Sequence, residues 1–498
     1  MLLSSAVVMT HWLLQHWQAV LTVLTTVGGY LLAFALIVRI VDERKEAAAT
    51  LAWILLIAFL PYLGALLYVT LGRRRVRRRS RRRRLARGLL ERGPDACPHH
   101  REGCTSLVRE DSAQLDEVAI QACRVAGEPF LAGNAVDVYL EANRAYRHMI
   151  EAIDGARHHV HLMSYIFRPD QAGRLFVERL QKKAAQGVEV RLLVDAVGSH
   201  RLPDSFLAPL LAAGGRFARF MPVFSLRPVW RPQLRNHRKL LVVDGRVAFT
   251  GGLNIGAEYQ GRKKKYAPWR DTQVRVEGPA CWRLQEVFVD DWFFASGENL
   301  QDRLYWEGFT GEGSPGENLV QVVESGPDRE RDTIHAVFFS AVCAARHRIY
   351  ITTPYLVPDN AMLTAIKTAA WRGVDVRLLL PGNSDLPLVK WAGRSFYREL
   401  LEAGVRLYEH SPGILHAKTM VVDGSWCTVG SANLDIRSFR LNFEVNVVVS
   451  GGDFAGRMER IFRDDISRAD ELTLEKLSGE PRLARFTASL CRVLSPVL

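Results

Sequence analysis

The chain has 498 residues, 48% of them hydrophobic, which is long enough for two or three domains. Its formal net charge is +13, but ten arginines lie between Arg73 and Arg84, so the rest of the chain carries only about +3. This distribution excludes a chain-wide basic surface, because the positive charge is local.

Two uncharged segments near the N-terminus, residues 19–38 and 47–72, predict two transmembrane helices. At about 1.5 Å per residue the first segment spans about 30 Å, the thickness of the hydrocarbon core of a bilayer. Aromatic residues near the segment ends are typical of a membrane interface; they are Trp12, Trp17, Trp53 and Tyr68. Two adjacent segments of this length are unusual as buried core helices. A cleaved signal peptide fits poorly, because no Lys or Arg precedes the first segment.

The sequence RRRVRRRSRRRR follows the second segment directly. Positive charge beside a membrane segment favours the cytoplasmic side, and two crossings place the N-terminus on that side too. The arginines suit anionic lipid headgroups better than nucleic acid in this position, although they also fit a pure topology signal. We assign residues 1–72 to the membrane helices and 73–110 to an arginine-rich juxtamembrane linker.

The linker also contains Cys97, His99, His100 and Cys104, which are close enough together to suggest zinc. No second pair of ligands follows at the spacing of a zinc finger, so we predict no metal site here. The seven cysteines of the chain are odd in number and mostly scattered, which argues against a disulfide framework in a reducing compartment.

Beyond the linker the chain is an internal duplication, with predicted lobes at residues 111–310 and 311–480. The segment VHLMSYIFRPD after His158 aligns with IYITTPYLVPD, which ends at Asp359. Each half shows strand, helix, strand, loop and a final hairpin. The helices carry apolar residues at helical spacing and end at Gly187 or Gly373. Short apolar runs, RLLVD and RLLLP, are typical of strands buried on both faces. We expect two α/β lobes packed as a pseudo-dimer.

The final hairpin of each half carries one repeated motif. HRKLLVVDGRVAFTGGLN runs from 237 to 254 and HAKTMVVDGSWCTVGSAN from 416 to 433. Asp-Gly between two apolar runs predicts a tight turn between strands. The shared residues are His237, Lys239, Asp244 and Asn254 in the first copy, and His416, Lys418, Asp423 and Asn433 in the second.

This pattern indicates chemistry on a phosphate. Side chains two apart on a strand share a face, so each motif His lies beside its Lys. The cation holds anionic oxygens while the imidazole acts on phosphorus or on the leaving oxygen. The two Asn residues add neutral hydrogen-bond donors. The motif aspartates sit at the turns, away from the histidines, and we favour a structural, charge-holding role for them over proton transfer.

The alignment continues past the second motif and sets Glu444 opposite Asp271. A carboxylate on a strand beside the motif would fix the tautomer of a catalytic imidazole and stabilise its cation. A surface acid at the end of a strand is the alternative, and the duplication leaves the two readings about equal.

The doubled motif resembles the HKD motifs of the phospholipase D superfamily. The segments PYLGALLYVTLG, WRDTQVRVEGPA and GSANLDIRSFRLNFE resemble those of bacterial cardiolipin synthases. This resemblance implies two tandem phospholipase D-like lobes of mixed β-sheet and helices, whose motifs meet at one active site. It also implies transfer of a phosphatidyl group between two phosphatidylglycerol molecules, with His237 as nucleophile and His416 as acid and base.

The resemblance further implies a multi-pass protein of the bacterial inner (plasma) membrane, with cytoplasmic lobes that contact phosphatidylglycerol and other anionic lipids. The two-histidine scheme calls for no metal or cofactor. The sequence leaves the oligomeric state undetermined.

Three alternative functions fit the sequence less well. A phospholipase D, or another phosphodiesterase or nuclease of the superfamily, would share the motifs, but the membrane segments and the resemblance around Trp269 argue against a nuclease. A catalytically dead scaffold is disfavoured because both motifs are intact. The metal-binding pattern of enzymes that use CDP-activated lipids is approached only at Asp154–Arg157, with the wrong spacing.

Two further segments have two readings each. RPVWRPQLRNHRK, before the first motif, is either a guide for anionic headgroups or a solvated loop. Residues 481–498 predict an amphipathic helix, with Leu483, Phe486 and Leu490 on one face. That helix either lies at a membrane interface or packs on the lobes.

Overall fold

The computed structural model of the chain describes residues 2–43, 47–72, 117–222, 233–262, 267–300, 305, 315–329, 331–479 and 481–493. These residues form two compact units: an N-terminal unit around residues 1–75, and a unit that holds both halves of the duplication. The arginine run, the Cys/His group of the linker and residues 223–232 lie outside the described residues.

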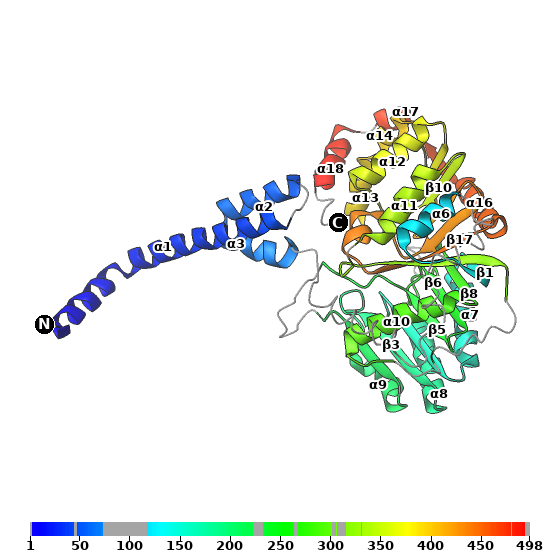
Figure 1. Ribbon diagram of the computed structural model, residues 1–498, viewed down its shortest axis with the longest axis horizontal. Helices are drawn as coiled ribbons and strands as arrows, with labels where there is room; N and C mark the ends of the chain where they lie inside the picture. Colours follow the sequence, from blue (N-terminus) through cyan, green and yellow to red (C-terminus); the bar gives the residue numbers. More distant parts are fainter. Residues whose placement is uncertain are drawn as a thin grey trace. The chain divides into compact units, whose positions relative to one another are not determined.

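The N-terminal unit contains α1 (Leu2–Asp42), α2 (Ala47–Phe59), α3 (Pro61–Leu67) and a final π-helical turn, η1 (Tyr68–Gly72) (Figure 1). Among the described helices, His16–Asp42 within α1 is the one that is long and apolar enough to cross a membrane, with a mean hydropathy of 2.1. The second predicted span is interrupted, because α2 ends at Phe59 and Pro61 begins α3. The 13 residues of α2 reach only about 20 Å.

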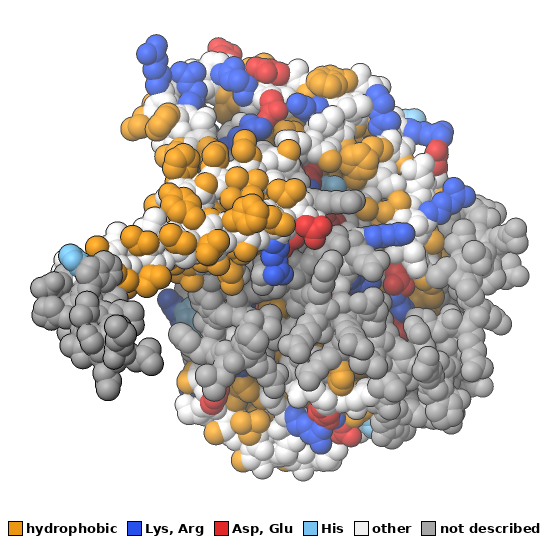
Figure 2. All heavy atoms as spheres, turned by 60° about the vertical axis from the view of Figure 1, so that its left-hand side comes forward, with side chains coloured by type: hydrophobic (Ala, Val, Ile, Leu, Met, Phe, Trp, Pro, Cys, Tyr) orange, Lys and Arg blue, Asp and Glu red, His pale blue; other side chains and the backbone are white. Residues whose placement is uncertain are grey.

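The three helices pack on one another. Ala33 and Ile40 of α1 share an apolar cluster with Ile57 of α2. The chain folds back after α2, since a Cβ on Gly64 would lie 2.8 Å from the Ile57 Cα atom. Hydrophobic side chains nevertheless cover much of the outer surface of residues 16–42 of α1 (Figure 2), and Phe34 is 69% exposed. Such a surface suits lipid better than water.

The second unit is built on one 16-stranded sheet in the order β18-β13-β12-β10-β14-β15-β17-β9-β1-β8-β6-β5-β2-β3-β4, with β7 paired to β13. The first half supplies β1 (Leu131–Tyr139), β2 (His159–Ser164), β3 (Glu189–Asp195), β4 (Arg216–Phe220), β5 (Leu240–Val243), β6 (Val247–Gly251), β7 (Trp269–Arg270) and β8 (Gln273–Glu277). The second half supplies β9 (Asn318–Ser325), β10 (Arg348–Thr352), β12 (Asp375–Asn383), β13 (Arg406–Leu415), β14 (Thr419–Val422), β15 (Trp426–Gly430), β17 (Glu444–Ser450) and β18 (Ala469–Leu472). A separate parallel pair is formed by β11 (Leu356–Val357) and β16 (Leu434–Asp435).

Read outward from the antiparallel β1–β9 seam, the two halves repeat the same strand pattern. In each half three strands are parallel, β2–β3–β4 or β10–β12–β13, and the motif hairpin is antiparallel to them. The predicted fold of two tandem α/β lobes with mixed sheets is therefore confirmed.

Helices cover both faces of this sheet. In the first half they are α7 (Ala142–Gly155), α8 (Gln171–Ala185), α9 (Asp204–Ala212) and α10 (Ala280–Ser296). In the second half they are α11 (Thr333–Ala344), α12 (Asn360–Trp371), α13 (Pro387–Arg394), α14 (Tyr397–Glu402), α15 (Ile436–Arg440), α16 (Gly452–Ile466), α17 (Leu474–Ser478) and α18 (Arg482–Val493). The segment α6 (Glu117–Ala126) precedes β1 in sequence but packs on α11 of the second half.

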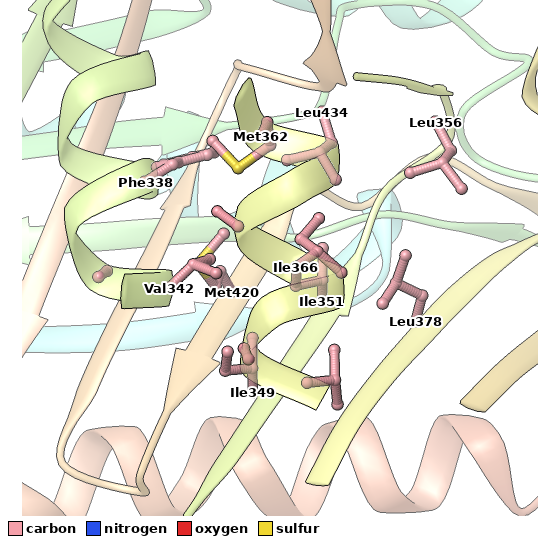
Figure 3. Packing of buried hydrophobic residues seen from close by; sticks show 14 of the residues in the cluster. Phe338, Val342, Ile349, Ile351, Leu356, Met362, Ile366, Leu378, Met420 and Leu434 are labelled. Atoms are coloured by element: carbon pink, nitrogen blue, oxygen red, sulfur yellow. The ribbon is translucent and has the colours of Figure 1, made fainter. Parts of the chain in front are cut away.

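Three apolar cores result. One lies under α7, α8 and α9 of the first lobe, and another lies under α11 and α12 of the second (Figure 3). The third is shared by both halves and contains Phe288 of α10 and Phe462 of α16. The predicted apolar faces of α8 and α12 are buried in the first and second of these cores. Gly187 and Gly373 follow those helices with positive φ of 87° and 88°. The shared core holds the two motif hairpins in a fixed relation.

Candidate active site

The two motif hairpins have the predicted form. β5 and β6 are joined by Asp244-Gly245-Arg246, and β14 and β15 by Asp423-Gly424-Ser425. The Asp and the Gly of each turn have positive φ. His237 and His416 lie three residues before β5 and β14, and both are buried.

Each motif is hydrogen-bonded to the other half of the chain. The His237 backbone N–H donates to the Phe443 carbonyl at 2.9 Å, and the His416 backbone N–H donates to the Arg270 carbonyl at 2.7 Å. The pairing of β7 with β13 belongs to the same exchange. The strand that follows one motif therefore runs beside the histidine of the other.

This exchange gives each histidine a carboxylate from the opposite lobe. His237 Nδ1 lies 3.1 Å from both carboxylate oxygens of Glu444. His416 Nδ1 lies 2.7 Å from Asp271 Oδ2. Because the carboxylates engage Nδ1, each histidine turns Nε2 away from its acid, and Nε2 of His416 lies 3.2 Å from Lys418 Nζ. His237 and His416 both line one cavity of about 610 Å³, so the structure brings the two histidines together.

The supports of the two carboxylates differ between the halves. Glu444 accepts hydrogen bonds from the Ser431 hydroxyl at 2.5 Å and from the Asn442 side chain at 3.1 Å. Gly252 occupies the position equivalent to Ser431, and a Cβ there would lie 2.0 Å from Asp271 Oδ1. The carboxylate of Asp271 therefore has its position only because Gly252 has no side chain. The longer side chain of Glu444 is held by the Ser431 hydroxyl.

Burial sets the charge states of the site. It lowers the pKa of His237 to about 4, with Glu444 opposing this shift. Burial, together with Lys418, also lowers the pKa of His416 against the pull of Asp271. For Glu444, burial alone would raise the pKa, but His237, Lys239 and the Ser431 hydroxyl together outweigh it and the pKa is lowered. The carboxylates are thus ionised, and His237 is neutral at pH 7.

The motif lysines are buried beside their histidines. The ammonium of Lys239 donates to the His237 carbonyl at 2.5 Å and lies over the ring of Tyr165. Lys418 Nζ lies 3.0 Å from His416 Nδ1 and also donates to the His416 carbonyl. Burial lowers the pKa of Lys418 to about 8 and lowers that of Lys239 well below its ordinary value. Dehydrated ammonium groups bind an anion strongly.

Both motif asparagines line the cavity. Asn254 Oδ1 accepts from the Ile166 backbone N–H at 3.1 Å. Asn433 donates to Asp435 at 3.0 Å, and its buried Oδ1 has no hydrogen-bond partner. Burial raises the pKa of Asp435 to about 6.

The motif aspartates lie at the turn ends of the hairpins. Asp244 accepts the backbone N–H groups of three successive residues, from Arg157 to His159, each at 2.8 Å. Asp423 makes the same three contacts at 2.8 Å, with Arg346 to Arg348. Each aspartate fastens its hairpin to the start of the neighbouring strand. These contacts favour the charge-holding role over proton transfer.

Arg238, between His237 and Lys239, faces the opposite side of the motif strand and is fully buried. It pairs with Asp291 at 2.7 Å and Glu324 at 2.8 Å. Asp291 belongs to α10 of the first half, whereas Glu324 belongs to β9 of the second. Arg238 therefore links the first motif to α10 of its own half and to β9 of the other half.

Several residues of the cavity have no place in the motif. They are Tyr165, Tyr355, Asp385, Asp435, Arg235 and Arg437. The two tyrosines lie in the duplicated segments SYIFRPD and TPYLVPD, but at positions one residue out of register, so the alignment did not mark them. Arg235 belongs to the arginine-tryptophan segment before the first motif. Asp385, which accepts from the Tyr355 hydroxyl at 2.8 Å, lies in a loop without such a signal.

Among the described residues, no group of three or more His, Cys, Asp or Glu side chains forms a candidate metal site. The Cys97–Cys104 group lies outside those residues.

Two duplicated lobes, each with a His-x-Lys strand and an acid for the other's histidine, define a phospholipase D-like enzyme of two lobes. The family described as "Cardiolipin synthase, PLD-like domain" matches residues 149–264 and 339–466, and "Phospholipase D-nuclease N-terminal" matches residues 31–73. The chain belongs to the cardiolipin synthase family of phosphatidyltransferases.

Three comparisons show the extent of the likeness. The chain is 36% identical to cardiolipin synthase 1 of Bacillus anthracis over 472 residues, which is 92% of this chain and 90% of that protein. It is 37% identical to the cardiolipin synthase of Geobacillus kaustophilus, with the same coverage. The crystal structure of phosphatidylserine synthase from Haemophilus influenzae has the same fold, with a TM-score of 0.58 at 16% identity, covering 77% of this chain and 100% of that one.

Proposed function

We propose that this protein makes cardiolipin and glycerol from two molecules of phosphatidylglycerol, through a phosphatidyl-histidine intermediate. The observation that carries the proposal is a pair of His–carboxylate dyads on one cavity, in a chain of this family. Each dyad takes its histidine from one lobe and its carboxylate from the other. A nuclease or simple phospholipase D is not favoured by the comparisons.

In the first step His237 Nε2 attacks phosphorus of the donor lipid, and the P–O bond to the headgroup glycerol breaks. His416, protonated and stabilised by Asp271, gives its proton to the departing alkoxide, so glycerol leaves neutral. Glu444 stabilises the positive charge that develops on His237. The low pKa of His237 supports its role as nucleophile, because the imidazole is neutral at pH 7.

In the second step a headgroup hydroxyl of another phosphatidylglycerol attacks the same phosphorus. Neutral His416 takes the proton of that hydroxyl, the P–N bond breaks, and His237 is regenerated. Lys239 and Lys418, together with Asn254 and Asn433, are proposed to stabilise charge on the non-bridging oxygens in both steps.

The test is to incubate the purified full chain with phosphatidylglycerol alone and to identify the products by mass. Cardiolipin and glycerol are expected; phosphatidic acid as the main product would favour the lipase. A rapid quench in alkali, followed by peptide mapping, locates the adduct. Label on His416 reverses the assignment of the nucleophile, and absence of any adduct defeats the two-step scheme. His148→Ala, at a partly exposed histidine paired with Glu151, is the matched control and should retain full activity.

We also propose that the N-terminal unit is a membrane anchor with cytoplasmic lobes. α1 supplies one crossing. The second predicted crossing would be made by α2 and α3 together, which is supported by 26 residues without a charge and by the arginines that follow. Cysteine labelling from either side of sealed vesicles tests this topology. The N-terminus and the lobes lie on one side if there are two crossings, and on opposite sides if α2 and α3 form a re-entrant hairpin.

A further inference from the structure

One edge of the catalytic cavity is apolar and open. Leu386 and Leu388 line the cavity, yet they remain 47% and 46% exposed. They flank Pro387, the first residue of α13, and directly follow Asp385 of the cavity. A leucine rim is unusual for a site that handles charged headgroups in water, since it leaves apolar surface in solvent.

The adjoining helix α18 packs on α13 and presents a second apolar strip. Ala488 and Cys491 face inward and are buried, at 6% and 5% exposure. The opposite face carries four large apolar side chains at a spacing of three or four residues: Leu483, Phe486, Leu490 and Val493, exposed to 75%, 65%, 56% and 73%. This spacing places the four on one helical face.

The two apolar regions are connected. Between α13 and the start of α18 lies a hollow of about 390 Å³, lined in part by Pro387, Trp391 and Pro481. Basic side chains accompany it: Lys390 and Arg394 line the hollow, and Arg482 and Arg485 are exposed on α18. We call the leucine rim and the outer face of α18 the apolar rim surface; its members are Leu386, Leu388, Leu483, Phe486, Leu490 and Val493.

We propose that the apolar rim surface docks the lobes on an anionic bilayer, with the cavity mouth opening onto the lipid. The proposal rests on the proposed function. Apolar side chains bordered by arginine are the composition of interfacial helices on anionic membranes. The substrate supplies a second argument. Its headgroup must reach the histidines while its acyl chains stay out of water, so the rim of the cavity must meet the bilayer. Both sequence readings of α18 then hold, because its inner face packs on the lobe while its outer face enters the membrane interface.

The test supplies the same headgroup in two forms, as bilayer lipid and as soluble monomers, to the full chain in vesicles of phosphatidylglycerol and phosphatidylcholine. One assay follows cardiolipin formed from vesicle phosphatidylglycerol, and the other uses short-chain phosphatidylglycerol supplied as monomers. The variant is Leu483→Ser/Phe486→Ser/Leu490→Ser. It is expected to lose about tenfold with vesicle lipid and to stay within about twofold with monomers. Wild-type protein that makes no cardiolipin in either assay refutes the proposed function instead.

Leu211→Ser/Trp371→Ser is the matched control, because both residues are exposed elsewhere on the lobes, at 42% and 65%. It should leave both assays unchanged. Equal activity of the triple variant and wild type on vesicle lipid overturns the proposal, as does an equal loss in both assays. A loss of both activities with a smaller oligomer in detergent would assign the surface to a second copy of the chain.

A charge variant gives an independent readout. Arg482→Glu/Arg485→Glu should reduce turnover of vesicle lipid and weaken or reverse its dependence on salt, since screening weakens the attraction between arginine and anionic lipid and relieves the repulsion of glutamate. A salt dependence equal to that of the wild type overturns the role of these arginines in docking.

Discussion

Replacing Asp423 by Asn should weaken the fold and spare the chemistry. Asp423 accepts three backbone N–H groups at 2.8 Å, one of them partly buried and two exposed. Asn keeps one oxygen and tolerates the φ of 52° at this position, but it loses the charge. Hydrogen bonds to an ionised acceptor contribute about 1.5–3 kcal/mol each when buried, so after allowance for exposure the loss is about 2 kcal/mol. At about 1–2 °C per kcal/mol for a folding unit of this size, the melting temperature should fall by about 2–4 °C.

The assay combines thermal unfolding of the full chain in detergent with cardiolipin formation per folded molecule at 25 °C. We expect kcat within about threefold of wild type for Asp423→Asn and for its counterpart Asp244→Asn. His416→Ala is the control with the opposite pattern, since it should lose turnover and keep its melting temperature. An Asp423→Asn protein that melts like wild type but has lost about a hundredfold in kcat would refute the structural role and place the aspartate in the reaction.

Three further predictions concern the site and its support. Gly252→Ala should displace Asp271, because the new Cβ would lie 2.0 Å from its Oδ1 atom. Single-turnover kinetics should show a rate constant about a hundredfold lower, with little change in melting temperature. A kcat equal to that of the wild type would contradict this cause. The value of kcat/KM should fall on the acid side near pH 4, where His237 takes up a proton, and on the alkaline side already below the ordinary imidazole value of 6.5, because burial makes His416 lose the proton that it gives to the leaving group; an acid limb at 6.5 would contradict burial as the cause. Arg238→Met should remove the guanidinium that pairs with the buried Asp291 and Glu324, of which Glu324 also pairs with Arg329, and should cost about 3 kcal/mol, seen as loss of folded protein on size-exclusion chromatography; a normally folded variant would count against this tie across the seam.

Local pattern was sufficient for the elements that carry the motifs. The apolar runs before Asp244 and Asp423 end in Asp-Gly, and the structure has a tight turn at both places. The equivalence of Asp271 and Glu444 could be found by alignment alone. Their partners could not, because the sequence places each acid after its own motif. Only the topology, with β7 beside β13, shows that each acid serves the histidine of the other lobe.

Hydropathy was less informative about the N-terminal unit. An uncharged run of 26 residues has the composition of a membrane span, but composition does not specify a straight helix. Pro61 and Gly64 were visible in that run, and they mark where the helix is interrupted and where α3 closes on α2. The rim leucines beside Asp385 had no periodicity to reveal them, because they lie at the junction of a loop and a short helix.

The exchange of acids between the lobes means that neither half of this chain contains a complete His–carboxylate dyad. An isolated first lobe would hold His237 without Glu444, and an isolated second lobe would hold His416 without Asp271. A single-lobe ancestor would have needed another copy of itself to complete even one dyad. In a single chain the two dyads can differ, with Gly252 beside Asp271 in one and Ser431 beside Glu444 in the other. Two identical subunits could not differ in this way.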